Sequence, residues 1–179
     1  MKILKKIGII IGIIVAIPLL IALFINKNYA VEREILINKP KEEVFNYIKL
    51  LKNQNLYSKW ANMDPNMIKT YQGTDGTVGF ISAWESDNDE VGKGEQEIKK
   101  ITDGERLDFE LRFQKPFETT EQAYMTTEKI TDQQTNVKWG FNGHIAYPMN
   151  FMLLFMDFED MIGNDLQTGL QNLKKNLEQ

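Results

Sequence analysis

Side chains that could act as nucleophiles or carry protons are scarce in this sequence. Its 179 residues include no cysteine and one histidine, His144. A single histidine without cysteine gives no zinc site of the usual composition and no recognisable centre for nucleophilic catalysis. His144 is out of phase with the alternating residues Val137, Trp139 and Phe141, so we expect it to point away from that apolar set. The sequence therefore predicts no catalytic residue, no metal site and no cofactor.

Two short motifs fall short of known binding sites. Asp87, Asp89 and Glu90 lack the spacing of a calcium-binding loop, and we expect a solvated turn there. The segment Gly92-Lys93-Gly94 lacks the third glycine and the strand-turn-helix setting of a nucleotide fingerprint. Within a strand, such glycines are more typical of a bulge or a sharp bend. A bend of this kind would curve a sheet and leave room for a ligand.

Aromatic and methionine side chains are the remaining chemical signal. Phe80 and Trp84 share one face of a predicted strand, as do Trp139 and Phe141, so each pair can point inward together. Ligand cavities are mostly apolar with a few polar groups, and Ser82, Gln122 and Tyr124 are candidates for the polar role. The alternative for each aromatic residue is plain core packing. The full set is Trp60, Phe80, Trp84, Phe109, Phe113, Tyr124, Trp139, Phe141, Met152 and Phe155.

One strand and two short helices are predicted to precede most of these residues. Residues 31–38 alternate with period two, as a strand does. Pro40 stands where a helix can start, followed by acidic residues in the first turn. A second short helix should carry Leu56 and Trp60, which are four residues apart, and end by Asp64.

Six further strands follow, separated by turn residues. Because their connections are short, neighbouring strands should be antiparallel. Leu107, Phe109, Leu111 and Phe113 alternate with polar residues, so one face should be packed and the other wet. The strands are expected at residues 67–72, 79–85, 91–101, 106–113, 119–130 and 135–144.

The C-terminal segment returns to helical spacing. An apolar stripe recurs every three or four residues from Phe158 to Leu177, typical of an amphipathic helix. Residues 149–156 are almost wholly apolar and too short to span a bilayer, so we expect them to be buried where this helix begins. An antiparallel sheet with one apolar face needs a cover, which this helix can supply. The sequence predicts an α+β domain with about seven strands.

An uncharged apolar run covers residues 7–25, directly after Lys2, Lys5 and Lys6. A helix of this length extends about 28 Å, close to the roughly 30 Å core of a bilayer. A cleaved signal peptide is the alternative, but its apolar region is shorter and ends at a small-x-small site, which residues 24–30 do not offer. The lysines before the run favour a cytoplasmic N-terminus. We expect an uncleaved single-pass transmembrane helix, with the remaining chain outside the cytoplasm.

The remaining chain suits one domain in size. All 25 acidic residues but only 17 of the 21 basic ones lie beyond residue 30, which gives this part a net charge of about −8. A net acidic domain lacks the basic surface of a nucleic-acid binder. We therefore divide the chain into an anchor, residues 1–28, and one domain, residues 29–179.

Several local sequences, in this order of elements, carry a family resemblance. Residues 37–45, Ile-Asn-Lys-Pro-Lys-Glu-Glu-Val-Phe, look like a strand-to-helix junction, and Trp60 would end the second small helix. Together they resemble the START-like superfamily, also called SRPBCC or polyketide cyclase/dehydrase and lipid transport proteins. Residues 78–84, 91–98 and 163–174 are similar to its membrane-anchored bacterial branch. The resemblance covers about residues 29–178 and implies a helix-grip fold, in which a curved sheet and a long C-terminal helix enclose an apolar cavity.

This resemblance favours a membrane-tethered domain that binds a lipid or another hydrophobic small molecule, rather than an enzyme. One alternative is a cyclase or hydrolase that uses the same cavity, with an acid or base among Glu118, Glu121, Glu128 and Tyr124. A protein-interaction module of the cell envelope is the other. The resemblance implies a ligand site among Trp60, Phe80, Trp84, Phe109, Tyr124, Trp139, Phe141 and Phe155.

Overall fold

Seven antiparallel strands form one open sheet in the order β1-β7-β6-β5-β4-β3-β2, in a computed structural model that describes residues 2–179. Strands β2 to β7 pair with one another in chain order, as a meander. The last of them, β7, also pairs with β1, which forms one edge of the sheet. The predicted antiparallel pairing is confirmed. The strands are β1 (Asn28–Ile37), β2 (Ile68–Gln72), β3 (Ile81–Glu85), β4 (Lys93–Thr102), β5 (Arg106–Lys115), β6 (Thr119–Thr131) and β7 (Gln134–His144).

A bulge lies where the start of β4 pairs with the end of β5, and its extra residue is Gln114 of β5. The register of β4 against β5 shifts between Lys93 and Gly94. Gly92 has φ +62°, and a Cβ placed there would lie 2.3 Å from the carbonyl oxygen of Lys115. Only glycine fits this conformation and this close approach. The bulge expected at Gly92-Lys93-Gly94 therefore has its extra residue in the partner strand β5, and Gly92 permits the close approach beside it.

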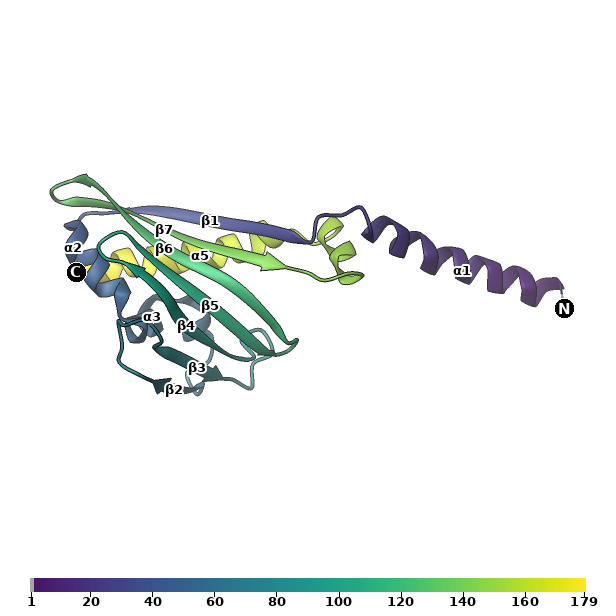
Figure 1. The fold of residues 1–179 in the computed structure, drawn as a ribbon, viewed down its shortest axis with the longest axis horizontal. Helices are drawn as coiled ribbons and strands as arrows, with labels where there is room; N and C mark the ends of the chain where they lie inside the picture. The colour runs from purple at the N-terminus through teal and green to yellow at the C-terminus, as the bar shows by residue number, and fades with distance from the viewer. Residues whose placement is uncertain (1) are drawn as a thin grey trace.

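Helix α5 (Phe158–Glu178) covers the concave face of the sheet (Figure 1). Asp157 caps it by accepting a hydrogen bond of 2.9 Å from the Asp160 amide, and acidic residues in the first turn complement the helix dipole. The predicted apolar stripe faces inward except at Met161, which is exposed. Each fully buried leucine in it contributes about 1.5–3 kcal/mol of transfer free energy. The fully or nearly buried members are Leu166, Leu170, Leu173 and Leu177.

Three short helices stand where the sequence predicted two: α2 (Lys41–Lys49), α3 (Leu51–Tyr57) and α4 (Lys59–Met63). The chain adopts extended ψ angles at Leu50 and Ser58, which separate them. The Asp75 carboxylate accepts hydrogen bonds from the first two amides of α3, so a distant residue starts that helix. Because of the break at Ser58, Leu56 lies exposed and does not share a helix face with Trp60.

Helix α1 (Lys2–Ala22) projects from one end of the sheet (Figure 1) and is long and apolar enough to cross a membrane. It ends at Ala22, three residues before the end of the apolar run. The side chain of Asn150 donates hydrogen bonds to the carbonyl oxygens of Ala22 and Ile25, at 2.7 and 3.1 Å. The Ala22 carbonyl is one of the unsatisfied groups at the end of α1, and the Ile25 carbonyl lies in the turn that follows, so one side chain satisfies both.

The short helix η1 (Met149–Leu154) corrects a second expectation. Residues 149–156 were expected to be buried where α5 begins, but Met149, Leu154 and Phe155 are exposed. Only Asn150 in this segment is fully buried, against the end of α1. The concave face of the sheet is already covered by α5, so these apolar side chains turn outward.

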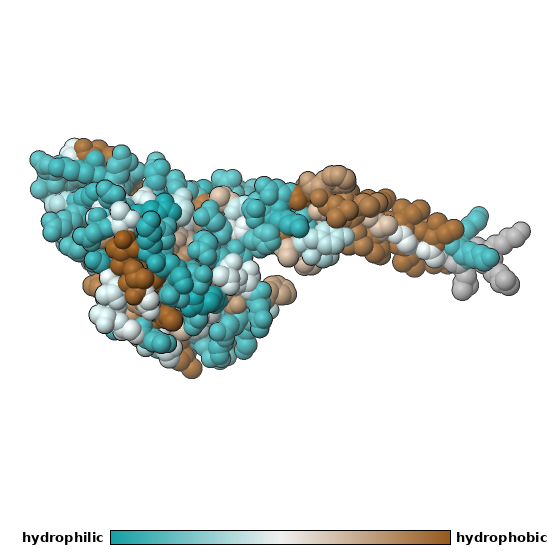
Figure 2. Space-filling view, in the orientation of Figure 1, coloured by the Kyte–Doolittle hydropathy of each residue, from teal (hydrophilic) through white to brown (hydrophobic). Residues whose placement is uncertain are grey.

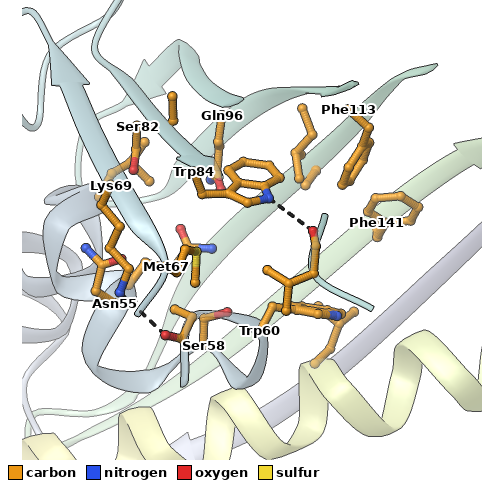
Figure 3. A pocket seen from close by; sticks show the side chains of 18 of the residues that line it. Asn55, Ser58, Trp60, Met67, Lys69, Ser82, Trp84, Gln96, Phe113 and Phe141 are labelled. Carbon is orange, nitrogen blue, oxygen red and sulfur yellow. Dashed lines mark hydrogen bonds between the residues drawn. The ribbon is translucent and has the colours of Figure 1, made fainter. Parts of the chain in front are cut away.

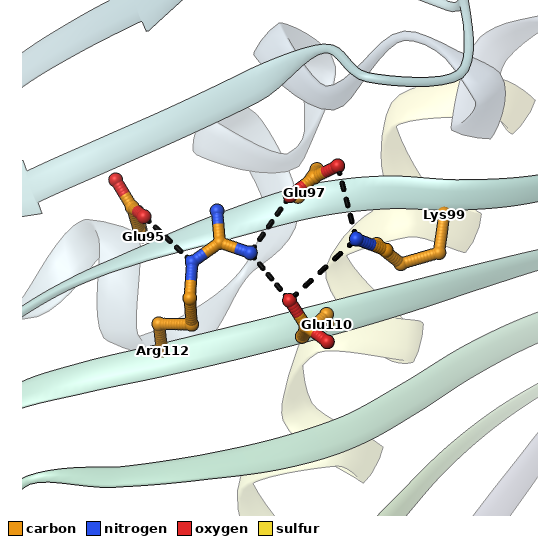
Figure 4. Close-up of polar contacts among 5 residues, drawn as sticks. All are labelled: Glu95, Glu97, Lys99, Glu110 and Arg112. Atoms are coloured by element: carbon orange, nitrogen blue, oxygen red, sulfur yellow. Dashed lines mark hydrogen bonds and ion pairs between the residues drawn. The ribbon is translucent and has the colours of Figure 1, made fainter.

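On the convex face, Arg112 of β5 lies among three carboxylates (Figure 4). Its guanidinium donates to Glu95 at 2.6 Å, to Glu97 at 2.7 Å and to Glu110 at 2.5 Å. Lys99 adds a second cation, 3.2 Å from Glu97 and 3.7 Å from Glu110. These groups are only partly exposed, so solvent screens them less than an ordinary surface pair. The hydrogen bond from Arg112, followed by that from Lys99, lowers the pKa of Glu97.

Replacing Arg112 with glutamine is expected to lower the free energy of unfolding by about 1–2 kcal/mol at neutral pH, because three neighbouring carboxylates lose their shared cation. A lowered carboxyl pKa stabilises the fold above the ordinary value of 4.5 and stops doing so as the pH falls through the lowered one. The two chains should therefore converge below about pH 4. Thermal unfolding followed by tryptophan fluorescence measures this.

The matched control is Lys129→Gln, which removes the cation of an exposed pair with Asp132. Exposed pairs contribute about 0–1 kcal/mol, so this variant should unfold close to the wild-type temperature. Equal effects of the two substitutions would show that the Arg112 cluster adds nothing beyond ordinary surface charge.

Candidate functional site

A cavity of about 260 Å³ lies between the concave face of the sheet, helices α3 and α4, and the first turns of α5 (Figure 3). Every strand except β1 contributes side chains to it, and the connection between β3 and β4 closes one side. Its lining residues are Leu51, Gln54, Asn55, Ser58, Trp60, Ala61, Met67, Lys69, Ser82, Ala83, Trp84, Glu90, Val91, Gln96, Leu111, Phe113, Ala123, Trp139, Phe141, Ile162 and Leu166.

All three tryptophans of the chain line this cavity. Trp60 of α4 packs edge to face on Trp139 of β7, with ring centroids 6.4 Å apart. Trp84 of β3 packs edge to face on Phe113 of β5 at 5.9 Å. Such pairs favour each other by about 0.5–1.5 kcal/mol beyond their buried area, so they hold the walls in place.

Two glycines make room for the indole rings. A Cβ at Gly94 would lie 2.8 Å from the Trp84 ring, and one at Gly169 would lie 2.7 Å from the Trp139 ring. Gly94 is the register partner of Trp84 in the neighbouring strand. Without these glycines, each ring would have to shift from its present place in the wall.

Polar groups in the lining are few. Ser58 and Gln96 are buried, and Ser82 and Asn55 also face the cavity (Figure 3). The indole nitrogen of Trp84 donates to the carbonyl oxygen of Val91 at 3.2 Å and so is already used. No hydrogen bond from the Gln96 amide is found in the described part of the chain, which leaves that amide available to a ligand.

Charged groups lie only at the rim of the lining. Lys69 is partly exposed, with its ammonium 3.4 Å from the carbonyl oxygen of Ala61, and Glu90 is exposed. They are the two charged residues among the lining residues described above. An apolar interior with uncharged hydrogen-bonding groups is suited to a neutral apolar molecule.

Four of the eight residues expected in the ligand site meet in this cavity: Trp60, Trp84, Trp139 and Phe141. The other four lie elsewhere. Phe80 and Phe109 are buried in the core beside the cavity, each 1% exposed, and do not line it. Phe155 directly follows η1 and is exposed on the surface.

Tyr124 is on the convex face of β6. Its hydroxyl donates to Glu32 at 2.5 Å, and the Arg106 guanidinium lies 4.1 Å from its ring centre. The inward side chains of β6 are those of Ala123 and Met125, so Tyr124 must point outward by strand alternation. Of the polar candidates, Ser82 lines the cavity, whereas Gln122 shares the outer face with Tyr124.

Gln96, Ser58 and Met67 line the cavity but were not among the sequence candidates. A signal for Gln96 exists in the alternation of β4, because it has the same phase as Gly94 and Ile98, which face inward. Nothing in the sequence marks Ser58, because its position depends on the break between α3 and α4.

Glu121 is the one carboxylate among the four acid-base candidates that faces the concave side. It occupies a row across the sheet with Leu111, Gly143 and Tyr29. Its oxygens accept from the Thr119 hydroxyl at 2.6 Å and from the His144 amide at 2.9 Å. Burial raises the pKa of Glu121 and raises the pKa of Tyr29 to about 12.

Glu121 is outside the cavity lining, and both of its oxygens are occupied. Glu118 and Glu128 are exposed, and Tyr124 is on the other face. The described chain therefore does not bring two of these candidate acids or bases together in the cavity.

No protein-family model matches the chain, and neither does any curated protein sequence. Solved structures do share its architecture. Norcoclaurine synthase from Thalictrum flavum, in complex with dopamine and hydroxybenzaldehyde, superposes with a TM-score of 0.61 and 11% identity, over 84% of this chain and 87% of that one. The Aha1 dimer from Colwellia psychrerythraea gives 0.58 and 14%, over 84% and 96%. Ara h 8.0201 gives 0.55 and 14%, over 84% and 95%.

The chain has the START-like helix-grip fold. The fold expected from the sequence resemblance is thus confirmed, with a seven-stranded antiparallel sheet and a C-terminal helix. Identities of this size show a shared helix-grip architecture and carry no activity from one protein to another.

Proposed function

We propose that the helix-grip domain, residues 29–179, binds a neutral apolar small molecule in the cavity between its sheet and α5. The observation that carries this proposal is a partly open, mostly apolar cavity of about 260 Å³, walled by three tryptophans and two phenylalanines, with the Gln96 amide facing it. A closely packed core would leave no such space. In the synthase structure, the same architecture holds two small aromatic molecules, which supports a similar use here.

The size of the cavity favours a compact ring compound over an extended lipid. Ligand pockets usually measure about 300–1,000 Å³, and this one, at about 260 Å³, is slightly smaller than that range. A ligand that loses about 200 Å² of apolar surface from water gains about 5 kcal/mol. One hydrogen bond to Gln96 or Ser58 would then set its orientation.

We also propose that α1 is a single-pass anchor, residues 1–28, with a cytoplasmic N-terminus and the domain outside the cytoplasm. Its length and apolar surface support the span, and the lysines in its first turns, before the apolar run, support the orientation. The domain begins only a few residues after α1, so it would be held close to the membrane surface.

Binding can be tested on the full chain in detergent micelles, because all three tryptophans surround the cavity. Native mass spectrometry of the purified chain should show a co-purified apolar molecule. In chain freed of it, titration with N-phenyl-1-naphthylamine, an uncharged fluorophore, should give saturable energy transfer from tryptophan. The proposal would be contradicted if the purified chain carried no bound molecule and if energy transfer from tryptophan rose linearly with the probe concentration in the micelle, without saturation.

A further inference from the structure

The surface beside the end of α1 carries apolar side chains that the ligand cavity does not use. In η1 and just after it, Met149, Leu154 and Phe155 are exposed, Phe155 by 74%. Leu23 and Phe24, directly after α1, are exposed too, Phe24 by 89%. Figure 2 shows the apolar surface of α1 continuing onto this end of the domain, while most of the domain surface in that view is hydrophilic. Water-soluble surfaces rarely gather such side chains.

The depth of this apolar patch is fixed by a buried contact. Asn150 of η1, 0% exposed, donates to the carbonyl oxygens of Ala22 and Ile25. The uncharged part of α1, residues 7–22, extends about 24 Å, so with Lys5 and Lys6 at one boundary of the roughly 30 Å hydrocarbon layer the end of α1 lies just inside the other boundary. Through Asn150, η1 is held at the same depth.

The chemistry of residues 145–156 suits that boundary. This stretch contains no charged residue, and the first carboxylate after it, Asp157, caps α5. Its backbone is largely self-satisfied, with amide-to-carbonyl bonds from Asn150 to Ala146 and from Met156 to Met152, at 3.1 and 2.9 Å. Backbone groups satisfied in this way can enter an apolar layer at low cost. Tyr147 adds a partly exposed aromatic residue with a polar tip, typical of membrane interfaces.

We infer that η1 and Phe155, together with Leu23 and Phe24, insert into the interfacial layer of the bilayer that α1 crosses. This membrane contact rests on the proposed anchor and is independent of the ligand in the cavity. A lipid surface is favoured over a protein partner because the apolar patch is continuous with the membrane helix. The hydrogen bonds of Asn150 also hold the patch at the end of that helix. The contact would fix the domain with the Asn28 end of β1 toward the membrane.

The absence of cysteine allows single cysteines, labelled with an environment-sensitive fluorophore, in the full chain. In vesicles of phosphatidylcholine and phosphatidylglycerol, a label at position 155 should emit at shorter wavelength and be quenched most by lipids spin-labelled near the headgroup. A label at position 149 should repeat this result. Position 14 in α1 should be quenched most by deep spin labels. The matched control is Ile130, another exposed apolar residue, in the β6–β7 hairpin at the opposite end from α1 (Figure 1), where a label should stay aqueous.

Each outcome decides the inference. Labels at 149 and 155 that behave like the label at 130, while position 14 stays in lipid, would overturn the membrane contact and leave the anchor intact. An aqueous label at position 14 would refute the anchor itself, and the contact with it. A shift at 155 that appears only at high protein-to-lipid ratio would mean that a second copy covers the apolar patch, which also overturns the inference.

Discussion

Replacing Ala123 with leucine is expected to weaken ligand binding at least about tenfold, or about 1.4 kcal/mol, while leaving the domain as stable as before or more stable. Ala123 faces the cavity from the middle of β6, between the register partners Phe109 and Phe141. The larger side chain would enter the space that the ligand needs. Filling an empty cavity commonly stabilises a fold by about 0.5–2 kcal/mol, so the two effects should have opposite signs.

Two measurements on the same sample separate these effects. Energy transfer from tryptophan to N-phenyl-1-naphthylamine reports binding, and thermal unfolding of the ligand-free chain reports stability. The matched control, Ala30→Leu, makes the same change at an exposed position on the convex face of β1, where neither quantity should change. A variant destabilised by about 1–3 kcal/mol, as for an overfilled core, would show that the space around Ala123 cannot hold a ligand.

The sheet and its covering helix could be predicted from the sequence because their signals are local. The alternation along β5 indicates which face of the strand is buried, and the apolar stripe of α5 does the same for the helix. The same local logic placed Trp84, Trp139 and Phe141 on the inward face, where they line the cavity. It could not separate Phe109 from them, because all four are apolar and point inward. Whether an inward side chain meets core or cavity depends on the distance between sheet and helix at that level.

The errors at Tyr124 and in residues 149–156 have specific physical causes. In β6, the inward set includes a carboxylate, Glu121, and the outward set includes an aromatic ring, Tyr124, so polarity alone misleads about the phase of the strand. Residues 149–156 are mostly apolar, but apolarity alone does not show whether a segment joins the core or lies on the surface. Asn150, the polar exception in that run, is the residue that decides its position.

Replacing Asn150 with aspartate is expected to release η1 from the end of α1. The carboxylate has no donor for the carbonyl oxygens of Ala22 and Ile25 and would repel them at 2.7 and 3.1 Å. Loss of these buried hydrogen bonds costs about 1–3 kcal/mol. The equilibrium between docked and free η1 should therefore shift about tenfold to hundredfold toward the free state. The domain would then be joined to α1 only through residues 23–27, and its orientation would broaden.

Spin labels at cysteines replacing Ile17 in α1 and Gln122 on the convex face of β6 report that orientation in reconstituted vesicles. The distance distribution should be narrow in the otherwise wild-type chain and broad in the Asn150→Asp chain. Asn66→Asp introduces the same charge in the exposed turn between α4 and β2 and should keep the narrow distribution. If Asn150→Asp also stays narrow, the two hydrogen bonds do not hold the domain. Apolar contact between η1 and its surroundings would then have to fix the orientation alone.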